Sequence, residues 1–249
     1  MREPFFFSEA SHIVDGQVAL SKAESHHAAK VLRLTKGELV VVVDGLGNAY
    51  RGAIVQMKRG GLVTVRIHSH ARSLGEPNVV LTLASGLSTG HKFDTIVEKG
   101  TELGVKRLVP LITEKSKVKL EDSKRARTKI RRYEKVALAA MKQCRRSYRP
   151  EISYPITFEN YLREVDPDSL SLLFHPSQSA SRLADIDIEA GLKRVNVIVG
   201  SESGFTEDEV ASAEARGVRI VSLGQRILRT ETAGPVVCAL IMNQLGELR

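Results

Sequence analysis

Three segments in the second half of the chain have the composition of ligand-binding strand ends. Each is an apolar run that passes into glycine or polar residues, at 172–176, 197–205 and 220–233. In an open α/β sheet, ligands bind beyond the carboxyl ends of the strands. Glycine lets backbone N–H and C=O groups approach a ligand closely, which suits recognition of an adenine edge. A single segment of this kind is typical of a simple turn, but three together predict a pocket.

Spacing excludes two other kinds of binding site. Gly45-Leu-Gly47-Asn-Ala-Tyr50 begins like a dinucleotide-binding loop, but Tyr50 stands where the third glycine is needed. That segment also lies between two predicted strands, not between a strand and a helix. His26 and His27 are adjacent on a predicted helix, so their side chains diverge and chelate poorly. We therefore expect no bound metal.

Alternating strands and helices predict the α/β domain that positions the three segments. Strands are expected at 79–84, 107–112, 170–174, 195–199 and 218–222, and helices at about 93–103, 123–144, 207–215 and 232–245. Thr206 and Glu209 form a capping box at the start of the helix at 207. Strands that alternate with helices imply a largely parallel sheet.

The first 72 residues follow a different pattern. Short apolar runs at 39–43, 49–55 and 62–67 are separated by glycine turns, which is typical of a small β-barrel. One helix is expected from Ser21 to Arg33, where Ser21 and Glu24 would form a capping box. A linker is expected at 69–78. We predict two domains, a β-barrel over residues 1–72 and an α/β domain over residues 73–249.

The net charge of +8 is concentrated in one region. Residues 115–149 carry 14 Lys and Arg but only 3 Asp and Glu. A concentrated basic region is typical of a surface that binds a polyanion. The alternative is a solvated helix face, although such faces usually mix both signs of charge.

Composition also bears on the cellular compartment. Cys144 and Cys238 lie far apart with no metal-type spacing, so no disulfide framework is expected. The N-terminal apolar run is too short for a signal peptide. No stretch approaches the roughly 20 apolar residues of a membrane span. We expect a cytoplasmic protein that does not enter a membrane.

The third segment carries a resemblance to a known family. Its sequence Leu223-Gly224, followed by Ile227-Leu228-Arg229-Thr230-Glu231-Thr232-Ala233, is similar to the signature of the bacterial 16S rRNA uracil-N3 methyltransferases of the SPOUT class. Stretches at 24–33, 99–105 and 143–150 agree in order and spacing, so the resemblance covers nearly the whole chain.

The resemblance implies a fold and a cofactor. It implies an N-terminal PUA-like β-barrel and a SPOUT-type α/β domain with a C-terminal trefoil knot, which is a rare exception to the rule that chains do not thread loops. The implied cofactor is S-adenosyl-L-methionine (SAM). The residues expected to bind it are Leu173, Phe174, His175, Gly200, Glu202, Gly204, Leu223, Gly224, Ile227, Leu228, Thr232 and Ala233.

The implied reaction is methylation of the N3 of a uridine in the decoding region of 16S rRNA, within the small ribosomal subunit. The weakly acidic N3 proton must leave or be stabilised. We expect Arg229 to position a phosphate or uracil oxygen and Glu231 to act as the base. An acidic group at a helix start is also favourable by itself, which is an equally good interpretation of Glu231.

Two further partners follow from the resemblance. RNA contacts are expected from His26, His27, Lys30, Arg33, Lys115, Lys117, Arg132, Gln143, Arg145 and Arg146. A homodimer is expected, with the apolar face at Ala233–Leu245 as its candidate interface. A monomer in light scattering at micromolar concentration would contradict that expectation.

The chain departs from the family pattern at two positions of the second segment. Ser201 stands where proline is usual, and Ser203 stands where glycine is usual, so Ser203 is expected to resist a backbone geometry that glycine accepts. Two other functions therefore stay open. One is a SPOUT enzyme that methylates a ribose 2′-hydroxyl, and the other is a non-enzymatic RNA-binding or ribosome-assembly protein that has lost SAM binding.

Overall fold

The computed structural model describes residues 3–57, 61–88, 90–116, 123–177, 180–189 and 191–248. Its contacts divide the chain into two compact units. The smaller unit contains residues 1–76 together with 138–149, and the larger unit contains residues 77–137 and 150–249. The last turns of one long helix thus pack with the N-terminal unit, although they follow residues 77–137 of the larger unit in sequence.

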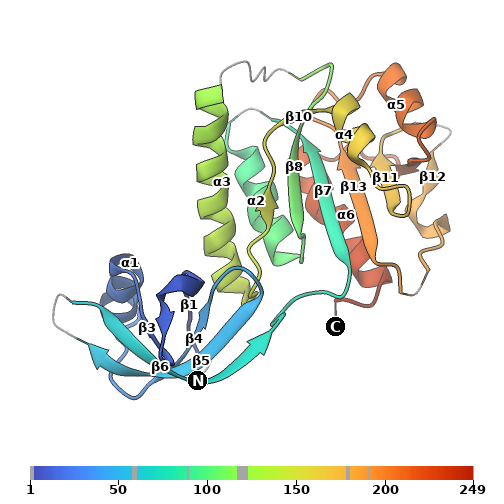
Figure 1. Cartoon of the computed structure of the whole chain (residues 1–249). Helices are drawn as coiled ribbons and strands as arrows, with labels where there is room; N and C mark the ends of the chain where they lie inside the picture. Colours follow the sequence, from blue (N-terminus) through green and yellow to red (C-terminus); the bar gives the residue numbers. More distant parts are fainter. Residues whose placement is uncertain are drawn as a thin grey trace. The chain divides into compact units, whose positions relative to one another are not determined.

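The smaller unit is built on a six-stranded sheet in the order β1-β4-β5-β6-β3-β2 (Figure 1). β1 pairs with β4 in parallel, and the other neighbours are antiparallel. Its elements are β1 (Phe5–Phe7), η1 (Ala10–His12), β2 (Ile13–Val14), β3 (Gln17–Ala19), α1 (Lys22–His26), η2 (His27–Val31), β4 (Leu39–Val43), β5 (Asn48–Met57) and β6 (Val63–Arg72). The strands expected at 39–43, 49–55 and 62–67 are confirmed, and β6 runs five residues further than predicted.

Two local expectations for this unit need correction. The predicted linker does not begin at Ser69, because β6 continues its pairing with β5 as far as Arg72. The capping box of the first helix is only half formed. Ser21 Oγ accepts a hydrogen bond from Glu24 N at 3.2 Å. The Glu24 carboxylate instead pairs with Lys142 within the same unit.

The larger unit confirms the predicted α/β domain. Its eight-stranded sheet has the order β10-β8-β7-β13-β11-β14-β12, with β9 beside β8, and its strand pairs are parallel. The strands are β7 (Val80–Gly86), β8 (Arg107–Ile112), β9 (Glu151–Ile152), β10 (Ile156–Thr157), β11 (Leu170–Phe174), β12 (Ser181–Arg182), β13 (Arg194–Val199) and β14 (Arg219–Ser222). The helices are α2 (Lys92–Glu102), α3 (Ser123–Cys144), α4 (Phe158–Glu164), the 3₁₀ turn η3 (Leu183–Asp185), α5 (Glu207–Glu214) and α6 (Thr230–Gln244).

Helices cover both faces of this sheet. One core cluster joins α2, α6 and the first half of α3 to β7 and β13, with Leu83, Ile96 and Val237 fully buried. A second cluster joins α4 and α5 to the opposite face, through residues such as Tyr161 and Leu173. The capping box of α5 is confirmed, since Thr206 and Glu209 each accept a hydrogen bond from the other's backbone N–H.

The chain returns across the sheet after β14. β14 lies between β11 and β12, whereas the following helix α6 packs against α2, β7 and β13. This return brings the start of α6 beside the carboxyl ends of the central strands. Closure of the smaller sheet into a barrel and the trefoil knot stay predictions from the resemblance. Among the described residues, no helix is long and apolar enough to span a bilayer.

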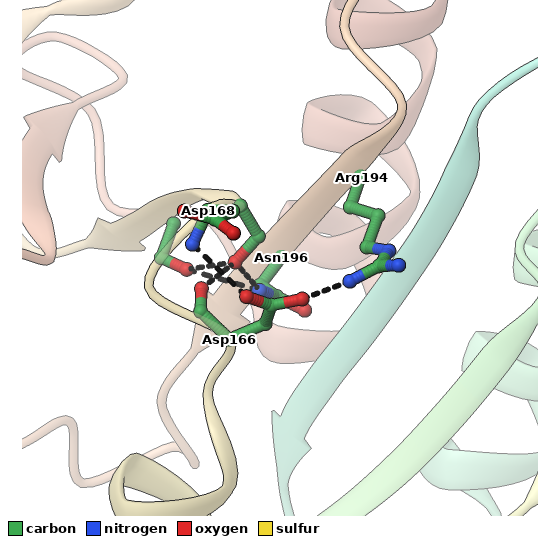
Figure 2. Close-up of polar contacts among 6 residues, drawn as sticks. Asp166, Asp168, Arg194 and Asn196 are labelled. Carbon is green, nitrogen blue, oxygen red and sulfur yellow. Dashed lines mark hydrogen bonds and ion pairs between the residues drawn. The ribbon is translucent and has the colours of Figure 1, made fainter.

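A polar cluster fixes the opposite, amino-terminal edge of this sheet (Figure 2). The carboxylate of Asp166 pairs with Arg194 at the start of β13 and accepts a hydrogen bond from Asp168 N at 3.0 Å. These two interactions, led by the one with Asp168 N, lower the pKa of Asp166. Asn196 donates to Ser169 Oγ at 2.7 Å, which ties β13 to the start of β11. The cluster is structural, because it lies at the end of the strands away from the predicted pocket.

Candidate functional site

A cavity of about 750 Å³ opens at the carboxyl ends of β11, β13 and β14. Its walls are the loops after these three strands, the first turn of α6, and side chains from the start of α2 and the loop after β8. The three segments singled out in the sequence therefore meet at one site. The lining residues are Lys92, Lys115, 174–176, 199–205, 222–224, 226–230 and Ala233.

Glycines permit the close packing of the loop after β13. A Cβ at Gly86, the last residue of β7, would clash with the backbone N of Ser201. Gly204 has a φ of +68° and donates its N–H to the Ser201 carbonyl at 2.9 Å, which closes a tight turn. Ser203 does not have a positive φ, so the backbone strain expected at that position is absent. Gly86 was missed by the sequence analysis; it lies two residues beyond the predicted strand at 79–84 and ends the observed β7.

Most of the residues expected to bind the cofactor line this cavity, but Leu173 and Thr232 do not. Leu173 is fully buried in the core beneath α4 and α5. Side chains alternate along a strand, so its neighbour Phe174 faces the other side and reaches the cavity. Thr232 is exposed on the outer side of α6. Ile227 lines the cavity but leaves 89% of its surface exposed.

Charged side chains gather at one side of the cavity. Lys92, at the start of α2, pairs with Glu202 at 2.8 Å. This hydrogen bond raises the pKa of Lys92; the negative charge of Glu231 also raises it, and the charge of Arg229 opposes the change. Glu202, Glu231 and Arg229 therefore each lie within electrostatic reach of Lys92. Sequence analysis missed Lys92, although it follows the carboxyl end of a predicted strand and begins a helical pattern.

Glu231 lies beside the cavity rather than on its surface. It is in the first turn of α6, directly after the lining residues Arg229 and Thr230. Its Oε2 atom is buried and has no hydrogen-bond partner within the described residues. A buried carboxylate oxygen without a partner is costly. Glu231 thus places an unsatisfied acceptor next to the cavity. This position fits both roles considered for Glu231, a base for the N3 proton and an acidic group that stabilises the start of α6.

The cavity suits an organic ligand that has both an apolar and a charged part. Phe174, Leu223 and Leu228 give it apolar walls, and Gly200 and Gly224 leave backbone groups accessible. Ser201 Oγ is buried and has no hydrogen-bond partner among the described residues, so the site retains an acceptor and donor for a ligand. These features match the needs of a nucleoside with a charged substituent.

Lys115, one of the residues expected to contact RNA, lines this cavity. Its Nζ donates a hydrogen bond to the carbonyl of Phe205 at 3.0 Å. His175 packs edge-on to the Phe205 ring, with 6.5 Å between ring centroids. Burial lowers the pKa of His175, and the charge of Lys115 adds to the effect. Both effects favour the neutral form of the imidazole.

The remaining residues expected to contact RNA differ in their surroundings. His26, Lys30, Arg33 and Gln143 are exposed. His27 is partly buried and lies edge-on to Phe6. All five residues belong to the smaller unit. The four exposed ones are accessible to a partner there.

Three basic residues of the expected RNA set have internal partners. Arg132 pairs with Asp94 of α2. The guanidinium of Arg145 lies 5.8 Å from the centroid of the Phe5 ring. The Arg146 side chain is only 2% exposed and pairs at 2.8 Å with Glu76, whose side chain is 6% exposed, so Arg146 lies in an internal ion pair. Lys117 lies outside the described residues.

Metal binding is not indicated in the parts of the chain that the structure describes. No group of three or more His, Cys, Asp or Glu side chains there is arranged to hold an ion. The two adjacent histidines of α1 and η2 differ in exposure, as expected for side chains that diverge from a helix.

Both units match family models. The RNA methyltransferase domain matches residues 75–242, and the RNA methyltransferase PUA domain matches residues 20–66. Ribosomal RNA small subunit methyltransferase E of Synechocystis is 33% identical over 242 residues, which cover 94% of this chain and 75% of that protein. The protein of the same name from Bacillus subtilis is 29% identical and is covered to 91%.

Solved structures resemble the whole chain. Ribosomal RNA small subunit methyltransferase E of Neisseria gonorrhoeae, solved with S-adenosyl methionine bound, has a TM-score of 0.86 at 27% identity, with 98% of each chain covered. A Legionella pneumophila protein solved with bound SAM also has a TM-score of 0.86, at 28% identity and the same coverage.

Proposed function

This chain belongs to the ribosomal RNA small subunit methyltransferase E family, and on that premise we propose that it transfers a methyl group from SAM to the N3 of a uridine in 16S rRNA. The observation that carries the proposal is the cavity at the strand ends, where most residues expected to bind SAM come together. The relatives named above supply the substrate class. The target is proposed to be in the decoding region of the small ribosomal subunit.

SAM supplies a methyl group activated by a positively charged sulfonium. Phe174, Leu223 and Leu228 provide apolar contacts for its adenine, and the glycine-bearing loops provide backbone groups for the adenine edge. Glu202 and Lys92 supply opposite charges for its amino-acid part. Holding donor and acceptor in line lowers the entropic part of the barrier.

The acceptor nitrogen becomes a good nucleophile only when its proton leaves. We assign the proton to Glu231, whose buried Oε2 lacks a partner in the described structure. Arg229 lines the cavity beside it and is the candidate to hold a uracil oxygen or a phosphate. Because N3 lies on the Watson–Crick edge of the base, the uridine must be unpaired or flipped out of its helix.

The active species is proposed to be a homodimer. The inner side of α6 is buried against the sheet, whereas Val236 and Leu240 on its outer side are 37% and 43% exposed. These apolar side chains are one helical turn apart and so form a stripe that a second copy of the chain can cover.

Replacing Ser201 by alanine is expected to weaken SAM binding about fivefold, the cost of one hydrogen bond. Ser201 Oγ is buried beside the cavity without a partner among the described residues, so a ligand atom is its natural partner. Isothermal titration calorimetry with SAM measures the change. Ser203→Ala is the matched control, because Ser203 lines the same cavity but is exposed.

Equal affinities for both serine variants and the unchanged protein would remove Ser201 from the binding site. If the unchanged protein bound no SAM at millimolar concentration, the methyltransferase proposal itself would fail.

A further inference from the structure

Two aromatic rings are stacked at the far end of the β5–β6 ribbon in the smaller unit. Tyr50 and His70 are directly opposite each other in the strand register. Their ring centroids are 4.9 Å apart and the ring planes differ by 21°. His70 Nε2 lies 3.0 Å from Asn48 Oδ1, a hydrogen bond that fixes the orientation of the imidazole.

The two rings differ in exposure. Tyr50 is partly buried and packs against the core of the sheet, whereas His70 is exposed. The stack is therefore anchored on one side and open on the other. A flat ring that is held rigidly and faces solvent is a platform on which a nucleobase stacks at little entropic cost.

An exposed cation lies next to this stack. Arg72 is exposed and is paired in register with Asn48, next to the Tyr50–His70 pair. Burial and the charge of Asp44 raise the pKa of Tyr50, whereas the charge of Arg72 lowers it, so both charged groups lie within electrostatic reach of the Tyr50 hydroxyl.

The carboxylate of Asp44, which also acts on Tyr50, is engaged inside the turn. Asp44 is only 5% exposed. Its carboxylate accepts hydrogen bonds from Leu46 N at 2.8 Å, Asn48 N at 3.1 Å and Asn48 Nδ2 at 2.7 Å. Arg72, in contrast, is exposed, so its guanidinium can contact a phosphate group.

We propose that the Tyr50–His70 stack, with Arg72, is a binding platform for an unpaired nucleotide of RNA. The base stacks on the open face of His70, and Arg72 holds a flanking phosphate. The proposal rests on the RNA-directed function proposed above and adds a surface to it. The platform is separate from the exposed residues of α1 and η2 that the sequence singled out. His70 and Arg72 lie on β6, in the first part of the segment that was predicted as a linker.

His70→Ala is expected to weaken RNA binding roughly five- to a hundredfold, the range of one base–aromatic stacking contact. The measurement is fluorescence anisotropy with a fluorescein-labelled single-stranded oligouridylate. His70→Phe keeps a flat ring and should restore most of the affinity. His68→Ala is the matched control: His68 is exposed on the same strand but lies in a register shift and has no stacked ring among the described residues. Arg72→Ala should reduce the slope of log affinity against log salt by about one.

Equal losses for His68→Ala and His70→Ala, or no loss for His70→Ala, would overturn the platform. SAM affinity of each variant, measured by calorimetry, should match that of the unchanged protein and shows that the variants are folded. Different results contradict the methyltransferase proposal and the platform proposal. Absence of SAM binding with normal RNA binding contradicts the methyltransferase function, whereas normal SAM binding with insensitivity to His70 contradicts only the platform.

Discussion

Glu231→Gln should lower the rate of methyl transfer by about a hundredfold or more, the usual contribution of a general base, while SAM affinity stays unchanged. Glutamine has nearly the same shape but does not accept the N3 proton. The buried Oε2 of Glu231 has no partner in the described structure, and Glu231 lies beside the cavity directly after Arg229 and Thr230, which line it. Single-turnover transfer from labelled SAM to small ribosomal subunits measures the rate, and calorimetry measures the affinity.

The competing interpretation of Glu231 predicts a different result. If the carboxylate only stabilises the start of α6, the substitution would lower stability by about 0.3–1 kcal/mol and change the rate only slightly. Glu207→Gln is the matched control, because Glu207 is an acidic residue in the first turn of α5 and does not line the cavity. A rate for Glu231→Gln that equals the rate for Glu207→Gln would contradict the base assignment.

Arg146→Met should destabilise the protein by about 3–5 kcal/mol, because it leaves a buried carboxylate without its partner. The side chains of Arg146 and Glu76 are 2% and 6% exposed. Glu76 also accepts a hydrogen bond from Tyr148 N at 2.8 Å, so the pair holds residues 146–148 to the end of the N-terminal segment. Urea denaturation followed by circular dichroism measures the change.

Two comparisons separate this structural role from a role in RNA binding. Arg131→Met removes an exposed arginine of α3 and should change stability by less than about 0.5 kcal/mol. The double variant Arg146→Met with Glu76→Leu should recover much of the loss, because both charges are then gone. Weaker RNA binding with unchanged stability for Arg146→Met would mean that the arginine contacts RNA after all.

Features set by neighbouring residues were predictable from the sequence. The capping box of Thr206 and Glu209 depends on residues three apart, and it forms as expected. The helix at 123–144 follows from its apolar period and has those bounds in the structure. The meeting of three strand ends at one cavity was also predictable, because parallel strands place their carboxyl ends along one edge.

Features set by distant residues were not predictable. The sequence of the basic region at 115–149 gives the number of its cations but not their partners. In the structure, Arg132 pairs with Asp94 and Arg146 pairs with Glu76, and both acidic residues come from other parts of the chain. Glu24 shows the same limit: its spacing from Ser21 fits a capping box, but Lys142 takes its carboxylate. Pairing across such sequence distances depends on the tertiary fold, which local spacing does not encode.

The nucleoside produced by the enzyme tests the central claim most directly. The purified protein would be incubated with SAM and with small ribosomal subunits that lack the modification, and the digested rRNA would be analysed by mass spectrometry. We expect 3-methyluridine in the 16S rRNA. A 2′-O-methylated nucleoside, or no methylated nucleoside on subunits or free rRNA despite SAM binding, would contradict it.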